Sequence, residues 1–220
     1  MPGRHGDDAA DRGVRMADQG TGAGAGSAGA GSGAPAPGGT RLSDGVLRWG
    51  TLPVAATVLT GVVALYMALV AFGNITDFGT NQQFVHHVLA MDTTFRDPQL
   101  MWRAITSPAL RDAAYVAIIV WETLAAVVLL FATWLWIAGL RGREYGRARR
   151  ASTVGLLMVL ALFGGGFMAI GGEWFAMWQS SDWNGLDAAA RNVALAAFTL
   201  VVVHLPGIHL HGDAATTRES

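Results

Sequence analysis

The feature that most constrains the fold is one stretch, residues 113–150, which joins a long apolar run to a cluster of arginines. A helix needs about 20 apolar residues, rising 1.5 Å each, to cross the hydrocarbon core of a bilayer. Residues 113–140 exceed that length, and residues 141–150 then carry five arginines and one glutamate. Because arginine-rich segments stay on the cytoplasmic side, the stretch predicts both a membrane span and its direction.

Three further apolar runs predict an all-α membrane protein, a bundle of four transmembrane helices. The spans are expected at residues 52–72, 113–140, 151–178 and 188–205, within a membrane domain covering residues 41–210. Only 14% of the residues are charged, against about 25% in an ordinary soluble domain. The lipid bilayer is therefore the expected environment of most of the chain.

Both ends of the chain are expected to lie outside this domain. Residues 1–40 are rich in glycine and alanine, which bury too little apolar surface to offset ordering entropy, so a disordered tail is predicted. Residues 211–220 read as a short polar tail. A net charge of -1 indicates no affinity for nucleic acid, and the absence of cysteine excludes disulfides and thiolate metal sites.

Arginine counts and tryptophan positions both bear on orientation. With residues 141–150 inside the cell and four spans, both termini are expected in the cytoplasm. Tryptophan is enriched at both membrane–water boundaries. Trp134 and Trp136 are predicted at the cytoplasmic boundary, and the opposite one is expected to hold Trp102, Trp174, Trp178 and Trp183.

The connection between the first two spans, residues 73–112, is long enough to have structure of its own. Residues 81–91 are amphipathic at helical spacing. Asp97-Pro98 predicts the start of a second short helix reaching Ile105, and Ser107-Pro108 the start of the next span. The two short helices are expected to lie on the outer surface, over the mouth of the bundle.

Two stripes of small residues predict close helix contacts, since small side chains let membrane helices approach. The first run carries Thr57, Gly61, Ala64, Ala68 and Ala71. The third run carries Ala161, Gly165, Ala169 and Gly172.

Glu122 is an acid deep inside an apolar run, expected near the midplane and level with residues 164–166, three consecutive glycines. A charged carboxylate there costs at least about 2.5 kcal/mol and normally faces the bundle interior. Two interpretations stay open: a group that accepts protons or binds a ligand, and a hydrogen bond that fixes packing.

Other polar residues are predicted at the outer face. Glu173 and Arg191 fall at similar depth and are expected to form an ion pair that sets helix register. The outer loop holds a polar cluster with Asn74, Asp77, His86, His87, Asp92 and Arg103. His87 and Met91, one helical turn apart, offer an imidazole and a thioether to a copper ion; the alternative is a solvated or capping role.

No cofactor is predicted. The one histidine inside an expected span is His204, on the opposite side from His86 and His87, so a haem held by two histidines of this chain is not expected. The chain has no phosphate-binding loop, HExxH or GxSxG motif, which counts against an enzyme.

The loop and second span also carry recognisable strings: YMALVAFGNITDFGTNQQFVHHVLAMDTTF at residues 66–95, MWRAI at 101–105, and IIVWETL at 118–124. With these strings the chain resembles a bacterial family of predicted small integral membrane proteins, domain of unknown function 2165, over residues 52–205. The resemblance implies a four-span protein of the bacterial cytoplasmic (inner) membrane. It implies no activity.

Three functions remain open from the sequence. The leading one is a non-enzymatic accessory or interaction subunit, associating with a membrane complex or with copies of itself. The second is a small proton-coupled transporter that uses Glu122. The third is a metal or redox protein working at the outer face through His86 and His87.

Overall fold

The structure, a computed structural model, describes residues 50–206. The tails expected at residues 1–40 and 211–220 lie outside the described residues. Within residues 50–206 every regular element is a helix, and four helices are long and apolar enough to cross a membrane. The prediction of a four-helix membrane bundle is confirmed.

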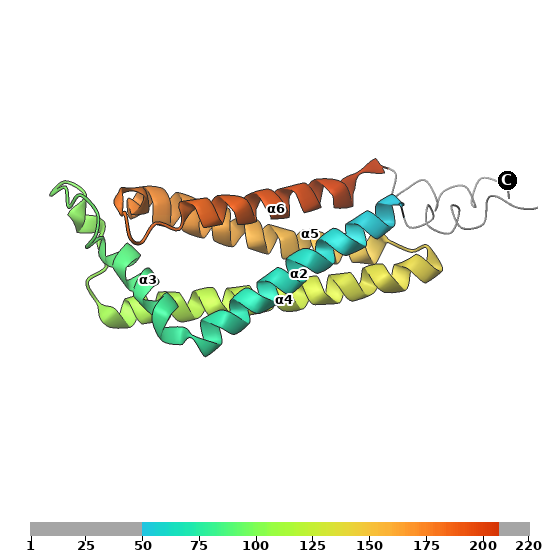
Figure 1. Ribbon diagram of the computed structural model, residues 1–220, viewed down its shortest axis with the longest axis horizontal. Coiled ribbons are helices and arrows are strands. Elements are labelled where there is room, and N and C mark those ends of the chain that lie inside the picture. The colour runs from blue at the N-terminus through green and yellow to red at the C-terminus, as the bar shows by residue number, and fades with distance from the viewer. Residues whose placement is uncertain (1–49, 207–220) are drawn as a thin grey trace, which may run out of the picture. The chain divides into compact units, whose positions relative to one another are not determined.

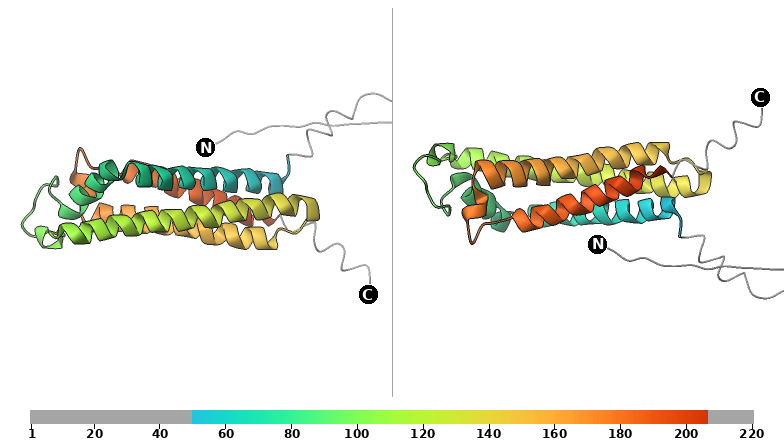
Figure 2. Two further views of the ribbon diagram at one scale, coloured as in Figure 1. Left: turned by 90° about the horizontal axis from the view of Figure 1, so that it is seen from below. Right: turned by 90° about the horizontal axis from the view of Figure 1, so that it is seen from above.

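The four long helices lie side by side (Figures 1 and 2). The first is α2, Leu52–Thr76, and the second is α4, Pro108–Gly142. The third span, Gly146–Trp174, is α5 (Gly146–Leu160) continued by the π-helix η2 (Ala161–Trp174). The fourth is α6, Leu186–His204. We call the end with residues 141–150 the arginine end, and the opposite one the lid end.

α4 begins where the Ser107-Pro108 pair predicted a helix start. The Ser107 side chain accepts a hydrogen bond from the backbone N–H of Leu110, and Pro108 occupies the first turn. With 35 residues, α4 is about 52 Å long, well beyond a hydrocarbon core of about 30 Å. Part of α4 must therefore extend past the membrane.

The first small-residue stripe packs inside the bundle, as predicted. Thr57, Ala64 and Ala71 are buried, and a Cβ on Gly61 would come 3.3 Å from Cγ2 of Thr133 on α4. The absence of a side chain at residue 61 therefore lets α2 approach α4 closely.

The second stripe does not pack as predicted. Ala161, Gly165 and Ala169 are exposed, and a Cβ on Gly165 would meet nothing within 4 Å. Of the four residues, Gly172 is buried, against Leu186. The stripe lies in η2, and a π-helix winds more residues per turn than the α-helix whose period was assumed.

The lid, residues 77–107, connects α2 to α4 at the lid end (Figure 1). It contains α3, Phe78–Ala90, which confirms the amphipathic helix expected at residues 81–91. The second predicted helix, from Asp97-Pro98 to Ile105, is present only as a short 3-10 helix, Met101–Arg103, preceded by turns. Asp97 instead accepts a bond from the backbone N–H of Gln99, closing a local turn.

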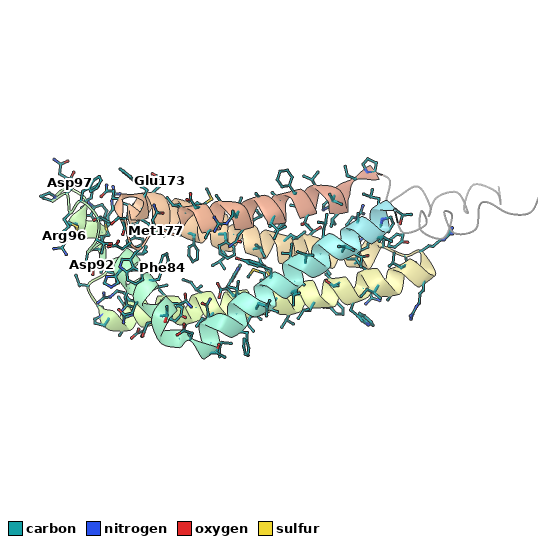
Figure 3. The ribbon with its side chains drawn as sticks, viewed as in Figure 1. Phe84, Asp92, Arg96, Asp97, Glu173 and Met177 are labelled. Atoms are coloured by element: carbon teal, nitrogen blue, oxygen red, sulfur yellow. The ribbon has the colours of Figure 1, made fainter. Side chains whose placement is uncertain are left out.

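α3 is packed on two sides. Val85 contacts Tyr115 and Ile119 of α4, whereas Val88 packs with Phe175 and Met177 from the segment between η2 and α6. Figure 3 shows Phe84 of α3 at the same end of the bundle as Met177 and Glu173. The lid is therefore packed against α4 and against the segment between η2 and α6.

Trp136 was expected in the boundary belt but is fully buried. Its indole N–H donates to Oγ of Ser152 at 2.8 Å, and its ring stacks on Tyr145, with centroids 5.6 Å apart. The partner hydroxyl explains the burial, because a buried indole N–H needs an acceptor.

Candidate functional site

The centre of the candidate site is the carboxyl group of Glu122, whose residue is 2% exposed. The side-chain amide of Asn74 donates a hydrogen bond to Oε2 of Glu122 at 2.6 Å. The two residues belong to α4 and α2, so the bond joins the two helices. No hydrogen bond to Oε1 of Glu122 is present among residues 50–206.

Tyr115 extends this network toward the lid. It is buried, and its hydroxyl donates to the backbone carbonyl of Asn74 at 3.1 Å. The ring of Phe78, the first residue of α3, lies 4.7 Å from the ring of Tyr115. Aromatic rings from the lid and from the lid-end part of α4 therefore lie next to Asn74.

Helix lengths place this pair toward the lid end. At 1.5 Å per residue, Glu122 is about 30 Å from Gly142 along α4, and Asn74 is about 33 Å from Leu52 along α2. Both distances are close to the full hydrocarbon thickness of about 30 Å. Along the helix axes, the pair therefore lies nearer the lid end than the arginine end. The depth expected from the sequence, near the midplane, stays a prediction.

The expected neighbour of Glu122 was the glycine triplet 164–166, but the observed partner is Asn74. A Cβ on Gly164 would contact Val193 of α6, and one on Gly165 would contact nothing. A signal for Asn74 does exist in the sequence. Asn74 follows Met67 and Ala71 at helical spacing and so shares their inward face if α2 continues past Phe72.

His86 joins the lid to α4. Its Nε2 lies 2.7 Å from Oδ1 of Asp112, and Nε2 of Gln82 donates to the same oxygen at 2.6 Å. Asp112 was not singled out from the sequence. The Ser107-Pro108 start signal placed it in the first turns of α4, which is the signal that could have found it.

His87 pairs within the lid. Its Nδ1 lies 2.9 Å from both carboxylate oxygens of Asp92, and its ring stacks on Trp183, with centroids 4.6 Å apart. Met91, proposed beside it as a copper ligand, is buried and has a left-handed backbone with φ 53°. No group of three or more His, Cys, Asp or Glu residues suited to a metal occurs in the described part.

The remaining predicted residues lie apart from Glu122. Asp77 is exposed and accepts a bond from the Thr80 hydroxyl at 2.9 Å. Glu173 and Arg191 are both exposed, and no ion pair joins them in the region the structure describes. Arg103 donates to the carbonyl of Trp174 at 3.3 Å. The outer polar residues therefore form several separate pairs and not one cluster.

Comparison with known proteins identifies one family. A family model described as predicted small integral membrane protein (DUF2165) matches residues 52–206. The match covers all four spans and the lid. No curated protein and no solved structure matches the chain.

Proposed function

This chain belongs to the family of predicted small integral membrane proteins (DUF2165), and we propose that it is a non-enzymatic accessory subunit of a membrane complex. In this role Glu122 locks α2 to α4 and does not take part in chemistry. The observation that carries the proposal is the hydrogen bond from Asn74 to the buried carboxyl of Glu122.

The pairing of the other titratable groups supports the same role. His86 bonds Asp112, and His87 bonds Asp92, so both histidines are engaged in holding the lid. A structural role in the lid accounts for these histidine–carboxylate pairs without a substrate. An association role also fits the outer surface of the bundle, because no more than 33% of each span's apolar window is buried within this chain.

The apolar face of α4 is a surface on which a partner helix or lipid can pack. It carries exposed large side chains at helical spacing, among them Val116, Val120, Leu124, Val127, Phe131 and Trp134. We further propose that residues 141–150 and both termini lie in the cytoplasm of a bacterial cell, with the protein in the inner membrane.

The test is the size and composition of the particle in native membranes. Polymer extraction into native nanodiscs, which avoids detergent, is followed by mass determination and protein identification. We expect an assembly heavier than the 23.1 kDa chain, with a second membrane protein at fixed stoichiometry. A monomer, or copies of this chain alone, would contradict the accessory role.

A second candidate function is proton-coupled transport, and one observation favours it. Oε1 of Glu122 has no hydrogen-bond partner among residues 50–206, so the carboxyl retains capacity to accept a proton. Proton uptake into vesicles containing the purified protein separates the two functions. Uptake that is lost in a folded Glu122→Gln variant would favour transport, and absence of uptake in both proteins favours the lock.

A further inference from the structure

Away from Glu122, the lid end carries a cationic side chain framed by two indole rings. The guanidinium carbon of Arg103 lies 4.9 Å from the ring centroid of Trp174 and 5.7 Å from that of Trp102. The two indoles meet edge to face, with centroids 5.5 Å apart. Cation–π attraction to both rings therefore favours this position of the guanidinium.

The two Nη groups of the guanidinium keep donors available. Nη1 donates one bond, to the carbonyl of Trp174 at 3.3 Å, whereas Nε is buried and has no partner. Nη2 forms no hydrogen bond with any of residues 50–206. Because a guanidinium has five N–H donors in one plane, most of its donors are unused by the protein.

The position of this group along the bundle indicates what can reach it. Trp174 is the last residue of the third span. Trp174 (46%) and its neighbour Trp102 (70%) are exposed, as are Phe95 (73%) and Trp178 (50%), which form a second edge-to-face pair. Exposed tryptophans at the end of a span lie at the level of the lipid headgroups.

We propose that Arg103 binds the phosphodiester of a phospholipid headgroup, with Trp102 and Trp174 holding the guanidinium toward it. The planar fork of arginine matches the geometry of phosphate oxygens, and phosphodiesters are the anions present at this level of a bilayer. This site goes beyond the proposed accessory role, because it concerns lipid and involves none of the residues around Glu122.

The acidic residue Glu173 provides a second test of the proposal. Glu173 precedes Trp174 in the sequence, and its side chain is exposed. A bound phosphodiester is repelled by this carboxylate, so Glu173→Gln is expected to strengthen binding. Weaker binding after that change would overturn the assignment.

Native mass spectrometry of the full chain in detergent measures this binding with phosphatidylglycerol as the probe. We expect Arg103→Gln to weaken retention about tenfold or more, the value of a charge-assisted hydrogen bond. Arg96→Gln is the matched control, because Arg96 lies on the same lid and also bonds a backbone carbonyl, that of Asp92, but has no indole ring of the described residues over its guanidinium. Equal loss in both variants, or no loss in Arg103→Gln, would overturn the proposal.

Two further probes separate binding of the lipid headgroup from binding of the acyl tails and from binding of free phosphate. Diacylglycerol has the same tails without phosphate, and it should bind the native protein weakly and show no dependence on Arg103. Inorganic phosphate should not displace the lipid. If diacylglycerol binds as well as phosphatidylglycerol, or if free phosphate competes equally, the phospholipid assignment fails.

A folding control keeps the test decisive. The thermal unfolding temperatures of Arg103→Gln and the native chain, measured without added lipid, show whether the variant is as stably folded as the native chain. If it is not, Arg103→Lys replaces it, since lysine keeps the charge and loses the planar fork. Retention by Arg103→Lys should then be weaker than native retention, and equal retention would overturn the proposal.

Discussion

Asn74 and Glu122 are joined by a 2.6 Å hydrogen bond between the side chains of α2 and α4. Along the helix axes, Glu122 lies about 30 Å and Asn74 about 33 Å from the arginine end, so both are nearer the lid end. Tyr115 bonds the backbone of Asn74 and contacts the first residue of α3. The Asn74–Glu122 pair thus links the contact between α2 and α4, through Tyr115, to the start of the lid helix α3.

The first prediction concerns attachment of the lid through Asp112. Its Oδ1 accepts bonds from both Gln82 and His86 of α3, so Asp112→Ala removes two contacts to one carboxylate. Hydrogen exchange in residues 78–90 should then accelerate about tenfold or more, while α2 stays protected. Unchanged protection of α3 would show that apolar packing alone holds the lid.

The matched control is Asp182→Ala. Asp182 is exposed and bonds only the adjacent Ser181 among the described residues, at 3.3 Å. Exchange in α3 should remain at the native rate in this variant, so that any acceleration in Asp112→Ala reports the two lost bonds and not a general loss of charge.

A second prediction tests the contact between α4 and α5. A Cβ on Gly155 would lie 2.6 Å from Cγ of Leu129, which is fully buried and cannot move aside easily. Gly155→Ala should lower the free energy of unfolding in detergent by about 1–3 kcal/mol, the usual cost of overpacking. The same substitution at Gly165, which faces open space, should leave stability within about 1 kcal/mol of native. Equal effects at the two sites would refute this packing.

The third prediction concerns orientation. The chain has no cysteine, so single cysteines report accessibility without background. Glu144→Cys lies in the turn between α4 and α5 and leaves all five arginines in place, and Ser181→Cys lies at the lid end. In intact cells an impermeant maleimide should label residue 181 and reach residue 144 only after lysis. The opposite pattern would invert the proposed topology.

The bundle was predictable because its determinants are local. Runs of about 20 apolar residues predict spans, and Pro53 and Pro108 mark two helix starts. The small-residue stripe on α2 predicted a close contact because that helix keeps the α-helical period throughout. The same reasoning failed at residues 161–172, where the π-helix changes which side chains share a face.

The candidate site was half predictable for a different reason. Glu122 stands out because an acid in an apolar run needs an internal partner. That partner, Asn74, was assigned to the loop, since α2 was expected to end at Phe72 and actually continues to Thr76. Asp112 was overlooked for another reason. The Ser107-Pro108 signal marks the start of α4, but no sequence pattern links residue 112 to Gln82 and His86 of α3. The end of α2 carries no such start signal, and helix ends are often weakly marked in sequence.

The bond between Asn74 and Glu122 can be measured most directly by a double-mutant cycle. Unfolding free energies in detergent are compared for the native chain, Asn74→Ala, Glu122→Ala and the double variant. If Glu122 serves as a lock, the two changes should be coupled by about 0.5–2 kcal/mol, the range for hydrogen bonds between membrane helices. Strictly additive costs, with no coupling, would contradict the account.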